Sequence, residues 1–335
     1  MVQLYISDSK AKIGFSENRI TVNNIDNPHS YPIETIDGVS IFGLSSISTK
    51  LIRELLTREI DLQLFSADGH YYGRLSSINN VNASRQKKQA LLSDDEEFAL
   101  EISKKIIDAK LRNQIGIVQK YKNCNKNNGL ILSKELDNIN YSYEFAQKST
   151  SIAELTGFEG NAARSYFSCL SKLVPEEFMF SGRSKRPPKD PFNSLISLGY
   201  SLIFKNIIGG IERHGMNAYF GFMHQDFPKH PTLASDIMEE WRAAIVDDVV
   251  MQLLISGIIK TDMFTKNESN GGFYISQNGT RILAKAVGDK MCKPDRYIKC
   301  DDYNYTFQYA LDLQLQSLAR AIDNRNPEEY KSVMV

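Results

Sequence analysis

The strongest constraint on the fold is a change in hydrophobic periodicity near residue 84. Before it, short apolar runs are separated by Ser, Asp, Glu and Asn, which is typical of strands. The segment 48–59 is the exception, because its leucines and isoleucine have helical spacing. The Asp68-Gly69 pair predicts a hairpin turn. The predicted strands are 2–6, 12–15, 19–22, 39–42, 60–65 and 71–75.

After residue 84 the apolar residues recur with the period of helices, and Ser93 to Glu96 resembles a capping box. The predicted helices are 94–123, 133–147, 159–172, 191–213, 232–257, 279–290 and 304–323. We therefore predict an α+β protein. A small N-terminal β domain with one helix covers 1–84, a linker covers 85–95, and a larger all-α domain covers 96–335.

Composition excludes several classes of protein. A chain of 335 residues with 42% hydrophobic and 24% charged residues is long enough for about two globular domains. Its four cysteines lack zinc-site spacing and fit a reducing cytosol. There is no signal-peptide pattern, and no apolar run approaches the ~20 residues of a membrane span. We expect a cytoplasmic protein without a membrane partner.

The formal net charge is zero, but the charges are unevenly distributed. Residues 84–126 carry ten bases and six acids, while 1–83 and 127–335 each have a net charge of −2. Basic stretches occur at 104–126, 181–190 and 281–299. Each is compatible with a solvated face. Three such stretches in one chain favour a polyanionic partner such as a nucleic acid.

Glu159 and His224 are the first two candidate site residues. Glu159 stands between Gly157 and Gly160 at the predicted start of a helix. It is either an acid that favours the helix dipole, or a metal ligand or general base that a substrate backbone can approach. His224 follows an apolar run and is either a satisfied core or loop residue or a ligand.

An acidic segment supplies the remaining candidates. Asp236 and Glu239 are three residues apart and share one helix face, and 236–248 holds five acids with Arg242 as its one base. The segment is either a solvated face or a cation site, because crowded carboxylates repel until a cation binds. Two carboxylates and one imidazole suit Mn²⁺ or Mg²⁺.

Four motifs in order resemble the Cas1 family of CRISPR-associated adaptation integrases and endonucleases. The resemblance covers nearly the whole chain. The motifs are Glu159-Gly160 with Ala163 and Tyr166-Phe167; Arg186-Pro187-Pro188 with Asp190-Pro191, Asn193, Leu195 and Gly199-Tyr200; Gly215 with Gly221-Phe222-Met223-His224; and Asp236-Ile237-Met238-Glu239 with Arg242 and Asp247. Two departures are Gly215-Met216-Asn217-Ala218, where the family often has Gly-Leu-Asp-Pro, and Glu240, where proline is common.

The resemblance implies metal ligands at Glu159, His224 and Glu239, with Asp236 as helper or alternative, and Mg²⁺ or Mn²⁺ as cofactor. It also implies DNA contacts, for which the candidates are Arg164, Arg183, Lys185, Arg186 and Arg242. Tyr166 either contacts the DNA 3′ end or packs in the core.

The family also implies an activity and an assembly. The protein would dimerise through its N-terminal part, and two dimers would flank a Cas2 dimer as a heterohexamer. This complex would join the 3′-OH ends of a double-stranded prespacer to the CRISPR repeat by transesterification, which is spacer acquisition in antiviral defence. One alternative is a metal-dependent nuclease that hydrolyses branched or single-stranded DNA or RNA without integration. Another is a non-catalytic DNA-binding scaffold.

Overall fold

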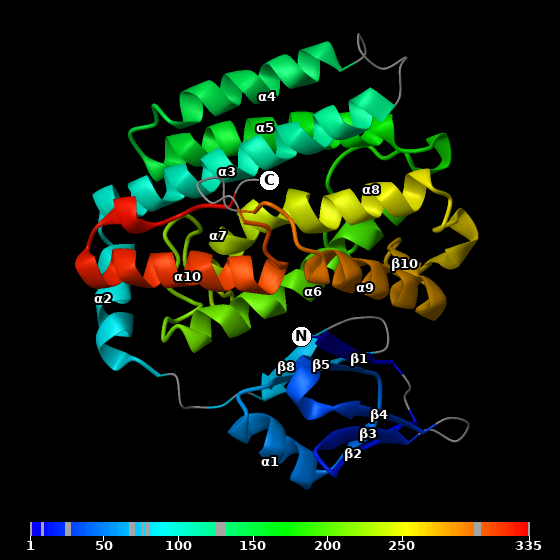
Figure 1. The fold of residues 1–335 in the computed structure, drawn as a ribbon. Helices are drawn as coiled ribbons and strands as arrows, with labels where there is room; N and C mark the ends of the chain where they lie inside the picture. The colour runs from blue at the N-terminus through cyan, green and yellow to red at the C-terminus, as the bar shows by residue number, and fades with distance from the viewer. Residues whose placement is uncertain are drawn as a thin grey trace.

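The chain has a β-rich N-terminal region followed by a helical C-terminal region, as predicted (Figure 1). The computed structural model describes residues 2–7, 10–23, 28–66, 71–75, 77, 81–124, 132–297 and 303–333. In Figure 1 the strands of the N-terminal region lie below the helices of the C-terminal region. The predicted turn at Asp68-Gly69 lies outside the described residues.

Two four-stranded sheets build the N-terminal region. The first has the order β1-β5-β7-β8, with β1, β5 and β7 parallel and β8 antiparallel to β7. Its strands are β1 (Val2–Ile6), β5 (Ile36–Phe42), β7 (Asp61–Phe65) and β8 (Tyr71–Leu75). The second sheet consists of β4 (His29–Pro32), β3 (Arg19–Asn23), β2 (Lys12–Ser16) and β6 (Ser46–Ile47). Helix α1 (Thr49–Thr57) buries Leu51 and Leu55 in a core shared with Ile13, Ile20 and Val39.

The helices of the C-terminal region pack around one large apolar core. Helices α3, α4 and α5 lie side by side at the top of Figure 1, and α9 and α10 lie beside α6. The helices are α2 (Ala83–Ser93), α3 (Glu96–Cys124), α4 (Ser133–Ala146), α5 (Ile152–Leu173), α6 (Pro191–Arg213), α7 (Thr232–Trp241), α8 (Asp248–Ile255), α9 (Gln277–Cys292) and α10 (Phe307–Asn324).

Two domain predictions need correction. Most of the predicted linker 85–95 is helical and belongs to α2, which Asn82 caps and which packs on α3 and α10. Arg85 of α2 pairs with Asp323 of α10 at 2.6 Å. The C-terminal region is also not all-α, since β9 (Phe264–Lys266) and β10 (Phe273–Ile275) form a hairpin. Strands of three residues are too short to show an alternating pattern.

Helix α6 is the central helix of the core. By length and composition it would be able to cross a membrane, which the sequence reading did not predict. However, 78% of its most apolar window is buried inside the protein. Its apolar side chains are therefore covered by the helices around it.

The predicted helix 232–257 is interrupted. Helix α7 passes into a π-helical turn, Arg242–Asp247, before α8 begins at Asp248. Such turns insert one residue into a helix and often occur at functional sites. Asp247 is the last residue of the turn, which separates the acids of α7 from Asp248.

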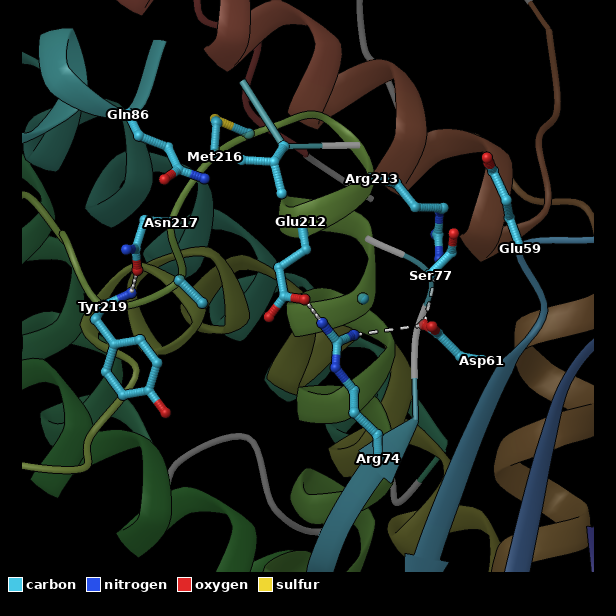
Figure 2. A pocket seen from close by; sticks show the side chains of 13 residues that line it. Glu59, Asp61, Arg74, Ser77, Gln86, Glu212, Arg213, Met216, Asn217 and Tyr219 are labelled. Carbon is cyan, nitrogen blue, oxygen red and sulfur yellow. Dashed lines mark hydrogen bonds and ion pairs between the residues drawn. The ribbon is translucent and has the colours of Figure 1, made fainter. Parts of the chain in front are cut away.

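An ionic cluster joins the two regions of the chain. Figure 2 shows Arg74 of β8 between Asp61 of β7 and Glu212 of α6. Arg213 of α6 adds a second contact to Asp61 at 3.7 Å. These groups line a cavity of about 280 Å³ at the junction. The cluster therefore ties the edge of the first sheet to the end of the core helix.

Candidate functional site

Glu159 lies on α5 and is not at a helix start. Ser151 caps this helix by accepting a hydrogen bond from the backbone N–H of Glu154 at 3.2 Å, so α5 begins seven residues before Glu159. The predicted helix start at 159 is therefore wrong, and of the two interpretations of Glu159 the helix-dipole acid does not apply. A Cβ added at Gly157 or Gly160 would meet nothing within 4 Å. The surface next to Glu159 is consequently open.

Asp236 of α7 is an internal anchor. It accepts hydrogen bonds from the backbone N–H groups of Phe222 (2.7 Å), Met223 (3.1 Å) and His224 (3.1 Å). The ring nitrogen Nδ1 of His224 is a further partner at 2.6 Å. The carboxylate is fully buried, and these contacts occupy both of its oxygens. Asp236 thus fixes the loop that carries His224.

Gly221 allows this loop to approach α7. A Cβ at this position would lie 2.8 Å from the Asp236 carboxylate and 2.8 Å from the backbone carbon of Thr232. No side chain fits so close to backbone. The N–H of Gly221 also donates to the Thr232 hydroxyl at 3.0 Å. The small residue is therefore required for the position of His224.

His224 presents its second nitrogen to Glu239. Because a carboxylate only accepts hydrogen bonds, Nδ1 carries the proton toward Asp236, and Nε2 lies 3.9 Å from Glu239 Oε1. Burial alone would lower the pKa of His224, but the hydrogen bond and charge of Asp236 raise it above its usual value. The imidazole is thus fixed through Nδ1 by Asp236, and its Nε2 faces Glu239.

Glu239 and Glu159 meet at a residue that the sequence reading did not select. The ammonium of Lys110, on α3, contacts Glu159 and lies 2.6 Å from Glu239 Oε2. Its side chain is only 5% exposed. Burial alone would raise the pKa of Glu239. The positive charges of Arg242 and Lys110 outweigh this effect and lower the pKa to about 2.

The sequence contains a signal for Lys110. Lys110 belongs to the basic stretch 104–126, for which a solvated face is one interpretation. However, it follows Ile106 and Ile107 by four and three residues, on the helix face that is buried. A lysine within such an apolar stripe is rarely buried without a paired charge. This placement would have marked Lys110 as a buried partner of an acid.

Arg242 and Arg183 lie near the same aromatic ring. Arg242 pairs with Glu239, and its guanidinium lies 5.1 Å from the ring centre of Tyr200. The guanidinium of Arg183 lies 5.5 Å from that centre. Burial, and then the charges of Arg242 and Arg183, lower the pKa of Lys185. Three predicted DNA contacts therefore form one positive cluster next to Glu239.

The other predicted DNA contacts lie elsewhere. Tyr166 is fully buried, and its hydroxyl donates to Asp247 at 2.8 Å, so the structure favours the core interpretation over a contact with DNA. Arg164 is exposed on α5. Arg186 is exposed in the loop after Arg183, where its charge helps to lower the pKa of His230.

The β9–β10 hairpin supports this basic loop. The N–H of Phe273 donates to the carbonyl of Pro188 at 2.9 Å. A Cβ at Gly272 would lie 2.6 Å from the ring of Pro187. This close contact holds residues 183–189 against the hairpin. The unpredicted strands thus position predicted site residues.

In the part of the chain that the structure describes, no group of three His, Cys, Asp or Glu side chains is arranged to hold a metal as it stands. Lys110 lies between the carboxylates instead. Glu239 Oε2 is buried without a hydrogen bond, although it faces this ammonium. The carboxylates therefore surround a position that already attracts a cation.

Sequence comparison identifies the family. The model of the family described as "CRISPR associated protein Cas1" matches residues 4–289. This chain belongs to the Cas1 family. A "CRISPR-associated endonuclease Cas1" of Mycobacterium tuberculosis (strain ATCC 25618 / H37Rv) is 48% identical over 334 residues, which are 99% of this chain and 97% of the relative.

Solved structures share the Cas1 fold. A chain of a "Cas6-RT-Cas1--Cas2 complex" has a TM-score of 0.82 and 26% identity, covering 99% of this chain and 36% of that one. A Cas1 protein from Thermotoga maritima has a TM-score of 0.79 and 21% identity, and the match covers 96% of this chain and 97% of that one. The β-rich and helical regions described above are thus those of Cas1 proteins.

Proposed function

We propose that this Cas1 protein is a divalent-metal-dependent DNA endonuclease and integrase of CRISPR adaptation. It would join the 3′-OH ends of a prespacer duplex to the CRISPR repeat. The observation that carries the proposal is the convergence of Glu159 and Glu239 on one cationic nitrogen, with the imidazole of His224 beside them. The 48% identical relative, named an endonuclease, supports it.

The residues present fit a hard divalent cation. Glu159, Glu239 and His224 Nε2 supply two carboxylates and one imidazole, a donor set that suits Mn²⁺ and is acceptable for Mg²⁺. The buried Glu239 Oε2 already faces one cation, the Lys110 ammonium, at 2.6 Å, and a metal ion would take the same oxygen. Bound there, the cation would lower the pKa of the attacking hydroxyl and stabilise negative charge at phosphorus.

Glu239, rather than Asp236, is the proposed acidic ligand of α7. Both oxygens of Asp236 are already occupied by backbone N–H groups and by the imidazole. Its role is to hold Nδ1 of His224, so that Nε2 faces the other carboxylates. A metal-bound Nε2 leaves His224 no free nitrogen for proton transfer.

The basic residues would hold phosphates. Arg242, Arg183 and Lys185 lie next to the carboxylates and would position the phosphodiester that reacts. The exposed Arg164 and Arg186 would contact the flanking backbone. In the reaction, the 3′-oxygen loses its proton and forms a bond to phosphorus, the bond to the 3′-oxygen of the repeat strand breaks, and that oxygen takes up a proton. No water is consumed.

The partners follow from the same family assignment. The 26% identical neighbour is part of a complex that contains Cas2, which supports a Cas2 partner for this protein. We propose dimerisation through the N-terminal region and two dimers flanking a Cas2 dimer. The double-stranded prespacer and the repeat are the DNA partners, and the cytoplasm is the proposed location.

The test is an integration assay with Cas2, Mn²⁺, a prespacer duplex and a supercoiled plasmid that carries a CRISPR repeat. We expect covalent joining of prespacer to plasmid. Glu159→Gln and Glu239→Gln should reduce joining at least a hundredfold. Glu144→Gln is the matched control, because Glu144 is exposed and forms an ion pair with Lys148 that includes no residue of the site. Cleavage without joining would instead establish the hydrolytic nuclease, and unchanged joining by both site variants would refute the metal site.

A further inference from the structure

Lys110 occupies the position between the two proposed acidic ligands. Its ammonium contacts Glu159 and lies 2.6 Å from Glu239 Oε2. One turn along α3, the amide of Asn113 donates to the backbone oxygens of Glu240 at 2.9 Å and Val333 at 3.1 Å. These bonds fix α3 against α7. Lys110 is therefore held at the site by its helix, and only its side chain is free to leave.

The charges explain why a lysine lies there. Two carboxylates that share a mostly buried site repel each other, and each needs a compensating charge. Arg242 compensates Glu239 from one side. Among the ion pairs of the described residues, Lys110 alone contacts both Glu159 and Glu239. It therefore performs the electrostatic task that a bound cation would perform.

We propose that Lys110 is a built-in counter-ion that a divalent metal ion must displace from Glu159 and Glu239. The inference rests on the proposed function, because it requires that these carboxylates bind metal. Lys110 is then a positioning residue, which keeps the two carboxylates together before metal binds and competes with the metal for the same oxygens. It favours the stability of the metal-free protein at the expense of metal affinity.

Removing the ammonium separates these two effects. In Lys110→Met the carboxylates lack their shared counter-ion, so the metal-free protein should unfold at a lower temperature. Mn²⁺ would meet an uncompensated pair of acids without a competing cation. We expect Mn²⁺ to bind Lys110→Met at least tenfold more tightly than it binds the wild type. Mn²⁺ should also raise the unfolding temperature of Lys110→Met by more than it raises that of the wild type.

Lys120→Met is the matched control. Lys120 also lies on α3, and it also pairs with a buried carboxylate, that of Asp248, at 2.5 Å. Its loss should destabilise the protein but leave Mn²⁺ affinity at the wild-type value. The measurements are calorimetric titration of the full chain with Mn²⁺, and thermal unfolding in EDTA and in Mn²⁺. Neither requires DNA or activity.

The outcomes separate the inference from the proposed function. If the wild type binds Mn²⁺ and Lys110→Met binds it equally or more weakly, the inference is wrong and the metal site stands. If neither protein binds Mn²⁺, the proposed metal function fails, and the inference fails with it. If Lys110→Met does not fold, the Mn²⁺ affinity of Lys110→Arg tests the inference instead. Its guanidinium can pair with both carboxylates at once, so Mn²⁺ should bind at least threefold more weakly, and unchanged affinity would overturn the inference.

Discussion

Replacing Lys205 with methionine should stabilise the protein at neutral pH. Lys205 lies on α6 with 2% of its surface exposed, and its nitrogen is 3.2 Å from the ring centre of Phe65 on β7. Burial lowers the pKa of Lys205 to about 6. In the unfolded chain a lysine titrates near pH ~10.4. Between these two values the unfolded chain holds a proton that the folded protein does not.

The size of the effect follows from this difference. Each pKa unit corresponds to about 1.4 kcal/mol, so the unfavourable contribution of Lys205 to folding is about 5 kcal/mol at pH 7 and about 2 kcal/mol at pH 9. The sign is fixed because the unfolded state binds more protons, and wild-type stability therefore rises with pH over this range. Methionine fills a similar volume without an ionisable group.

The test is the free energy of unfolding in urea, measured at pH 7, 8 and 9 for Lys205→Met and the wild type. The advantage of Lys205→Met over the wild type should fall by about 1.4 kcal/mol per pH unit. Lys148→Met is the control, because Lys148 also lies over a phenyl ring, that of Phe145 at 4.7 Å, but is 60% exposed. Its difference from the wild type should stay constant. An advantage of Lys205→Met that does not change between pH 7 and 9 would refute the reasoning.

Three further substitutions test the site. Asp236→Asn keeps one acceptor oxygen for four hydrogen bonds, so we expect a loss of about 3 kcal/mol in unfolding free energy in EDTA, together with loss of integration. Tyr166→Phe removes a buried donor to Asp247 and should cost about 1–3 kcal/mol, while DNA affinity in a binding titration stays unchanged. Weaker binding would instead indicate that Tyr166 contacts DNA. Gly221→Ala forces a Cβ to 2.8 Å from the backbone of Thr232 and should cost about 2 kcal/mol or more, with reduced Mn²⁺ affinity.

Much of the fold follows from local patterns. The segments 12–15, 133–147 and 191–213 differ from the observed elements by at most one residue at either end, since their apolar spacing and flanking residues agree. Helix α5 is a case in which the local pattern predicts the wrong helix start. The predicted helix begins at 159, between Gly157 and Gly160, but the observed helix continues through both glycines because Ser151 caps it earlier and its apolar face is buried.

The candidate site depended on a different kind of information. Asp236 and Glu239 share a helix face in any sequence reading, so spacing alone leaves both as possible ligands. The structure distinguishes them by the backbone N–H groups of the neighbouring loop, which converge on Asp236. The position of Lys110 between two carboxylates is missing from the sequence prediction for a related reason. Its role depends on contacts with two distant helices, and a count of charges along α3 does not contain them.

The π-helical turn at Arg242–Asp247 sets the rotational phase between two sets of acids. Glu239 lies before it and faces Lys110. Asp247, the last residue of the turn, faces Tyr200, and Asp248, directly after the turn, faces Lys120. Each helical residue adds about 100° of rotation. If the same residues formed a continuous α-helix, every side chain after the turn would be rotated by about that angle relative to Glu239. The wider turn is therefore what allows Glu239 and Asp248, on one continuous helical segment, to face different lysines of α3.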